Sequence, residues 1–112
     1  MVKVVWFLKK AEHLSMDEFR RWWLDSHAPM VVEKQGRMLS RYIVNIKTDT
    51  DDLPGAPNTS FEWDGMAEEW FESEEAAHQA FTLPSASNTR ADVMAHVSTI
   101  SRVIVTEHHI ID

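Results

Sequence analysis

The N-terminal strand pattern constrains this chain more than any other feature. Residues 2–8 read Val-Lys-Val-Val-Trp-Phe-Leu, in which Trp6 lies on one face of a strand while Val5 and Phe7 lie on the other. A strand that is bulky and apolar on both faces needs cover on both. Helices of the same chain can cover one face, so something else must cover the second.

Composition excludes several classes of protein. The chain has 112 residues, of which 44% are hydrophobic and 26% charged, so we predict a single globular domain over residues 1–112. Eleven Lys and Arg against 18 Asp and Glu give a net charge of −7, which argues against a nucleic-acid partner. Because cysteine is absent, disulfides, thiolate catalysis and cysteine-ligated metals are excluded. No apolar run has the length of a membrane span or signal peptide, so we expect a cytoplasmic protein without a membrane partner.

A helix begins after Ser15. Ser15 and Glu18 form a capping-box pattern, and an apolar helical stripe that includes Trp23 follows. Pro29 lacks an amide donor and its ring crowds the preceding turn, so the helix is predicted to kink or restart around residues 25–29. Gly36 is a suitable stop.

The remaining pattern predicts an α+β fold. The expected elements are strands over 39–46, 65–72 and 102–111, a helix from the Ser73 cap to about 83, a helix starting near 88 or 89, and a loop over 49–60. This order is the ferredoxin-like βαββαβ plan with an extra helix before the last strand. Helices cover only one sheet face, and a second copy is the simplest cover for the other. We therefore predict a homodimer through the sheet faces, which encloses a space between the two sheets.

Two motifs resemble the EthD-like family. Residues 19–29, FRRWWLDSHAP, are similar to its F-R-x-x-W-x-x-x-H-A-P signature, residues 64–73, DGMAEEWFES, to its D-G-x-A-E-x-W-F-x-S strand, and Arg41-Tyr42 to its R-Y step. The family belongs to the dimeric α+β barrel group, whose members include methylmuconolactone methylisomerase and polyketide cyclases. The resemblance implies a site without cofactor or metal in each barrel half, where His, Tyr and carboxylate side chains act on an oxygenated ring or polyketide.

Three residues are the catalytic candidates. His27 lies on the helical stripe beside Pro29, where a partly buried imidazole can act as an acid or base; the alternative is a core histidine. Tyr42, the only tyrosine, can donate a hydrogen bond to a substrate oxygen, or can be an ordinary strand aromatic. Glu68, with Glu69 as its rival, is the predicted second base or the group that orients His27. We expect this carboxylate to raise the pKa of His27 more than burial lowers it.

The candidate substrate-binding residues are mostly large side chains that share a face with these groups. They are Trp6, Trp23, Met66, Trp70 and His109, the last preferred to His108 by its strand parity. The six histidines include no H-x-x-x-H pair, so no metal is predicted. The three glycines form no G-x-G-x-x-G motif, so no nucleotide cofactor is predicted.

The leading functional hypothesis is a cofactor-free isomerase, cyclase or lyase. It would act by proton transfer on a small hydrophobic substrate, an oxygenated ring or a polyketide. Two alternatives of other classes stay open. One is a non-catalytic EthD-type accessory or carrier that shelters a hydrophobic metabolite for a partner oxygenase. The other is a cofactor-free monooxygenase.

Overall fold

The computed structural model describes residues 1–50, 53–57 and 60–112. In chain order the elements are β1 (Val2–Lys10), α1 (Met16–Arg21), the π-helical segment η1 (Trp22–His27), α2 (Ala28–Gln35), the 3-10 turn η2 (Gly36–Met38), β2 (Arg41–Ile46), β3 (Gly65–Phe71), α3 (Glu74–Thr82), α4 (Ala86–His96) and β4 (Val97–Val105). This order confirms the predicted α+β, ferredoxin-like fold with its extra helix.

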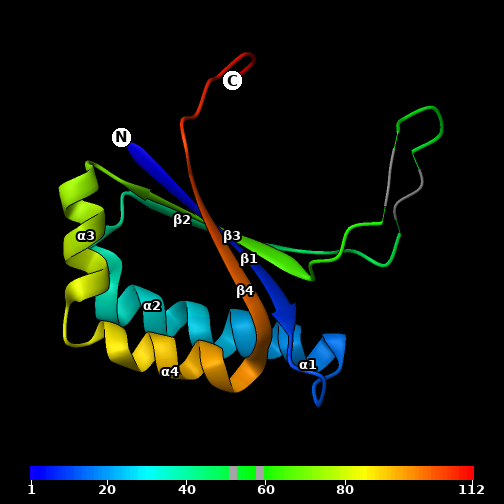
Figure 1. Cartoon of the computed structure of the whole chain (residues 1–112), viewed down its shortest axis with the longest axis horizontal. Coiled ribbons are helices and arrows are strands. Elements are labelled where there is room, and N and C mark those ends of the chain that lie inside the picture. Colours follow the sequence, from blue (N-terminus) through cyan, green and yellow to red (C-terminus); the bar gives the residue numbers. More distant parts are fainter. Residues whose placement is uncertain (51–52, 58–59) are drawn as a thin grey trace.

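The four strands form one antiparallel sheet in the order β2-β3-β1-β4. Trp6 of β1 pairs with Ala67 of β3 and with Arg102 of β4, so these three side chains share a face. Figure 1 shows the helices gathered on one side of this sheet, with α4 alongside α2. One sheet face is therefore covered by helices, and the other is open.

The start of the first helix follows the predicted capping box. The Glu18 backbone N–H donates to Ser15 Oγ at 3.1 Å, and the Ser15 N–H donates to Glu18 Oε1 at 2.9 Å. The predicted irregularity before Pro29 takes the form of η1, in which the Ala28 N–H donates to the Trp23 carbonyl. Because Pro29 cannot supply the next α-helical donor, a widened turn keeps the helix continuous through α2.

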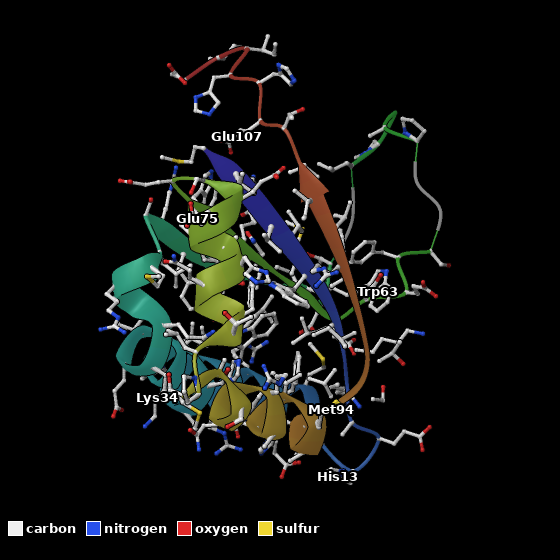
Figure 2. The ribbon with its side chains drawn as sticks, turned by 60° about the vertical axis from the view of Figure 1, so that its left-hand side comes forward. His13, Lys34, Trp63, Glu75, Met94 and Glu107 are labelled. Carbon is white, nitrogen blue, oxygen red and sulfur yellow. The ribbon has the colours of Figure 1, made fainter. Side chains whose placement is uncertain are left out.

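Two predicted boundaries are wrong. The last strand covers Val97–Val105 instead of 102–111, because the first residues of β1 pair with its end and β1 offers no partner beyond them. Residues 106–112 leave the sheet as a tail. Figure 2 shows Glu107 and Met94 at opposite ends of β4, with Glu107 beyond the end where the strand stops. Helix α4 also begins at Ala86, earlier than predicted. Of the predicted loop over 49–60, residues 51–52 and 58–59 lie outside the described residues.

The core divides into two apolar clusters on the helix-covered face. One is built around Phe19, Trp22 and Trp23 with Leu8, and the other around Phe71 with small alanines of α3. Trp6 packs against both clusters, so it lies where they meet. Among the described residues no helix is long and apolar enough to cross a membrane.

Candidate functional site

A cavity of about 410 Å³ lies between the helix-covered face of the sheet and helices η1, α2 and α4. Its volume is typical of a site for a small molecule. Its walls are mainly apolar and include Trp6, Leu8, Trp23, Val31, Phe81 and Val93. The polar side chains that also line it are His27, Gln35, Tyr42, Glu69, Thr89, Arg90 and Arg102. The sequence predicted a space between two stacked sheets, whereas this cavity lies under the helices of a single chain.

His27 is the last residue of η1 and is only 6% exposed. Its Nδ1 lies 2.9 Å from Oδ2 of Asp92 on α4, and no described residue forms a hydrogen bond with its Nε2. Burial lowers the pKa of His27, and the hydrogen bond with Asp92 opposes this shift without reversing it. The prediction that a carboxylate outweighs burial and gives His27 a raised pKa is therefore wrong. At neutral pH the imidazole is mainly neutral and can accept a proton at Nε2.

Asp92 holds this imidazole in place. Its Oδ2 also accepts a hydrogen bond from Trp22 Nε1 at 3.1 Å, and the Trp22 ring stacks on His27 with 4.9 Å between centroids. The other side of the cluster is closed by His96, which stacks on Trp22 at 4.6 Å and whose Nδ1 lies 2.7 Å from the Asp92 carbonyl. These contacts restrict rotation of His27, so its Nε2 keeps one direction.

Tyr42 and Glu69 occupy paired positions on β2 and β3 and both line the cavity. Burial raises the pKa of Glu69 to about 7, although Trp6 Nε1 donates a hydrogen bond of 2.5 Å to its carboxylate. Burial also raises the pKa of Tyr42 to about 12, with a hydrogen bond from the Trp23 side chain acting the other way. Tyr42 is therefore a hydrogen-bond donor at neutral pH, and Glu69 populates both its neutral and its charged form.

Three predicted site residues lie on the open sheet face, away from the cavity. Glu68 is paired there with Lys3 at 2.6 Å and accepts a hydrogen bond from Asn45 Nδ2 at 2.9 Å. Met66 and Trp70 share its face because they alternate with Glu69 along β3. The prediction that Glu68 lies beside His27 is wrong, because β3 meets β1 in a register that places Glu69 opposite the buried Val4.

His109 is also outside the cavity. It lies in the exposed tail, where its Nε2 is 2.9 Å from Glu107 and its Nδ1 is 2.9 Å from Asp112. Since β4 ends at Val105, strand parity does not extend to this residue and the reason for preferring it to His108 is lost. Of the predicted residues, the structure brings together His27, Tyr42, Trp6 and Trp23 at one cavity.

The sequence analysis missed the contribution of α4. Asp92 contacts His27 from 65 residues away, and Thr89 and Arg90 line the cavity from the same helix. The only local signal is the four-residue spacing of Asp92 and His96, which places both on one helix face. In the described part of the chain, no group of three or more His, Cys, Asp or Glu side chains could hold a metal ion.

The Asp64-Gly65 step of the second motif has a structural role at this site. A Cβ atom on Gly65 would collide with the Trp23 ring and lie 2.8 Å from the carbonyl oxygen of Asn45. Asp64 meanwhile accepts a hydrogen bond of 2.9 Å from the backbone N–H of Lys10. The pair therefore fixes the start of β3 against β1 and leaves room for Trp23, which lines the cavity.

The comparisons with known proteins agree with this fold. The sequence profile of the EthD domain matches residues 11–99, and the chain belongs to the EthD family. The structure is similar to an EthD family protein from Bacillus halodurans, with a TM-score of 0.74 and 19% identity over 96% of this chain and 99% of that one. No curated protein sequence matches the chain.

Two further solved structures share the fold at lower identity. One is SnoaB, a cofactor-independent oxygenase from Streptomyces nogalater, with a TM-score of 0.67 and 13% identity over 96% of this chain and 93% of that one. The other is a dimeric protein of unknown function and ferredoxin-like fold from Bacteroides fragilis, with a TM-score of 0.65 and 13% identity over 93% of each chain. Fold similarity at this level of identity does not carry an activity from one protein to another.

Proposed function

We propose that this protein is a cofactor-independent enzyme that moves a proton on a small oxygenated ring or polyketide bound in the cavity. The isomerase, cyclase and lyase classes share this step. The observation that carries the proposal is the convergence of His27, Tyr42 and Glu69 on one apolar cavity of about 410 Å³. A buried base such as His27, together with hydrogen-bond donors such as Tyr42 and protonated Glu69, can break a C–H bond next to a carbonyl group.

In this reaction His27 Nε2 takes the proton from a carbon next to the substrate carbonyl. The electron pair of the broken C–H bond forms a C=C bond while the π pair of the carbonyl group moves to its oxygen, and the Tyr42 hydroxyl stabilises the resulting enolate by donating a hydrogen bond. Asp92, at 2.9 Å from Nδ1, stabilises the imidazolium that forms. Return of the proton to another carbon gives an isomer, whereas loss of a leaving group protonated by Glu69 gives elimination.

The fold similarity to SnoaB supports a second candidate, a cofactor-independent oxygenase. Its first step is the same removal of a proton, after which the substrate carbanion reacts with O₂. An oxygen electrode separates the two candidates, because only the oxygenase consumes O₂ during turnover. A carrier would bind the same molecules and return them unchanged.

The test begins with a screen of the purified protein against muconolactones and polyketide mimics. On the substrate found, His27→Ala should lower kcat by about 10²–10⁴-fold, the usual contribution of a general acid or base. His78→Ala is the matched control, since His78 is exposed on α3 outside the cavity. The melting temperature is measured on both variants. A His27→Ala protein that is destabilised but turns over normally per folded molecule would show that His27 is only a core residue.

We also propose that the chain forms a homodimer through the open face of its sheet. Val5, Phe7, Ile43 and Trp70 lie on that face, and Val103 of the edge strand β4 is still 43% exposed there. The dimeric protein from Bacteroides fragilis, which shares the fold, supports the proposal of a dimer. Such an interface belongs to the obligate class, which buries roughly 2,000 Å² or more in total.

A further inference from the structure

We propose that the substrate carries a carboxylate, which Arg90 and Arg102 bind at the mouth of the cavity while the apolar body of the molecule extends inward toward His27. This inference rests on the proposed function, because it names the class of molecule that the cavity would take. It adds a requirement that proton transfer alone does not impose: a negative charge at one end of the substrate.

The two arginines reach the cavity from separate elements. Arg90 lies on α4 and Arg102 on β4, and both line the cavity although they are exposed residues. A long side chain that borders a cavity and still contacts water lies at its opening, with its charged end toward the solvent. Both arginines therefore border the cavity where it meets the solvent, one from α4 and one from β4.

Neither arginine is neutralised by the protein in the part of the chain that the structure describes. No carboxylate there lies within 4.0 Å of either guanidinium, although several other basic residues, Lys3 among them, do form such pairs. Arg90 Nη1 donates one hydrogen bond of 3.3 Å to the Phe81 carbonyl, and Arg102 lies 5.6 Å from the centre of the Trp6 ring. Each guanidinium has five N–H donors, so most of them are available to a ligand.

The acidic groups close to the cavity do not pair with these arginines. Glu69 is kept partly neutral near pH 7 by burial, and Asp92 contacts His27 and Trp22 and is not among the residues that line the cavity. A chain with a net charge of −7 repels anions in general, so two available arginines that line one apolar cavity favour an anionic ligand there specifically. Guanidinium groups bind carboxylates with two parallel hydrogen bonds, which supplies both affinity and orientation.

The orientation has a consequence for the reaction. With the carboxylate held at the mouth, the ring or chain behind it contacts Trp6 and Phe81, and its far end is directed into the cavity where His27 and Tyr42 lie. Neutral ethers and neutral polyketides lack the group that fixes this direction. Lactones and aromatic rings that bear a carboxylate possess it, so we assign the substrate to that class.

The experiment compares an aromatic acid with its neutral amide. The probes are 2-naphthoate and 2-naphthamide, and binding is followed at neutral pH by quenching of tryptophan fluorescence, since Trp6 and Trp23 line the cavity. We expect the acid to bind at least about tenfold more tightly than the amide. Arg90→Gln and Arg102→Gln should each lower the affinity for the acid by about tenfold and leave the affinity for the amide unchanged. Added salt should weaken only the acid.

Arg37→Gln is the matched control, because Arg37 is exposed on η2 and does not line the cavity. Equal affinity of the acid and the amide, no binding of the acid, or equal weakening of both probes by the arginine variants would overturn the inference. Because binding is measured without turnover, its result is independent of the proposed reaction. An intact preference for the acid together with full activity of His27→Ala would remove the proposed function and leave the carboxylate site standing.

Discussion

Glu68 and Glu69 are neighbours in β3, yet strand alternation sends them to opposite faces of the sheet and into contrasting surroundings. Glu69 lies in the apolar cavity with Trp6 Nε1 as its only described side-chain hydrogen-bond donor, and burial raises its pKa to about 7. Burial also acts to raise the pKa of Glu68, but the hydrogen bonds from Lys3 and Asn45 and the charge of Lys3 outweigh it, so its pKa is lowered. The same carboxylate is thus a group that can exchange a proton on one face and a fixed anion on the other.

The charges on the open face neutralise each other. Lys3 bridges Glu68 and Glu107, and Trp70 Nε1 donates a hydrogen bond of 2.9 Å to Glu107. The helix-covered face instead buries His27, Tyr42 and Glu69 without a cation bonded to them, and burial shifts the pKa of each toward its neutral form. The comparison indicates that a titratable group paired with a cation stabilises the structure, whereas a buried titratable group without such a pair is suited to proton transfer.

The largest expected effect concerns assembly through the open face. Val103→Asp places a charge on that face, where it would be buried in each half of the interface, and should raise the dissociation constant of the dimer by about 10²–10³-fold or more. Leu24→Asp is the matched control, since Leu24 is 46% exposed on the helix side. Light scattering should give twice the 13.0 kDa chain mass for the natural protein and for Leu24→Asp, and one chain mass for Val103→Asp at low concentration. A natural protein that is monomeric at micromolar concentration would contradict the dimer.

The next effect compares the loss of one hydrogen-bond donor on each face. Tyr42→Phe deletes only the hydroxyl in the cavity and should lower kcat by about 10²-fold or more, because the enolate oxygen loses its donor. Trp70→Phe deletes the indole N–H that binds Glu107 on the open face and should leave turnover per folded molecule unchanged. Steady-state kinetics on the screened substrate check both. Equal losses in the two variants would end the assignment of the chemistry to the cavity.

A third effect tests the two glutamates through stability. The folded-state pKa of Glu69 is raised from 4.5 to about 7, so its proton stabilises the fold at low pH and this contribution is lost as the pH rises between these values. Glu69→Gln keeps an uncharged group and does not lose this contribution. Its unfolding free energy relative to that of the natural protein should therefore be roughly 1–3 kcal/mol higher at about pH 8 than at about pH 4.

Glu68→Gln should change stability in the opposite direction. The folded-state pKa of Glu68 is lowered, so its contribution is present above the unfolded value of 4.5 and disappears as the pH falls. Solvent screening keeps the loss at about pH 8 below about 1 kcal/mol. Urea denaturation at both pH values measures the two variants. Curves that shift in the same direction would show that the faces do not differ in this way.

The smallest effect concerns the positioning of His27. Asp92→Asn removes the charge that opposes burial, so the pKa of His27 should fall further, and the acid limb of the kcat/KM profile should move to lower pH with it. The rate at the optimum should fall about tenfold, because the imidazolium loses its stabilising charge. NMR titration of the His27 ring checks the shift, and Asp25→Asn, at an exposed position of η1, is the control. A rate loss without any change in the titration would assign Asp92 a purely structural role.

Local patterns in the sequence were sufficient for most of the fold. The capping box at Ser15 and Glu18, the irregular turn before Pro29 and the helix cap at Ser73 all lie where predicted, because each depends on hydrogen bonds between residues a few positions apart. The alternation in β1 also put Trp6 on the opposite face from Val5 and Phe7, and the structure shows that the Trp6 face is the one covered by helices. The same short-range regularities placed His27 and Tyr42 as candidates, which the structure brings to one cavity.

The tertiary structure alone decided which glutamate faces the cavity and which carboxylate meets His27. Both faces of β3 carry bulky apolar side chains, so its pattern is compatible with either Glu68 or Glu69 inward, and only the register with β1 selects Glu69. Asp92 reaches His27 across 65 residues, through the packing of α4 against η1, and no local periodicity encodes that contact. Local hydrogen bonding and periodicity are properties of a short segment, whereas the partner of a buried polar group is set by the whole chain, which must bury its apolar surface and satisfy its polar groups together.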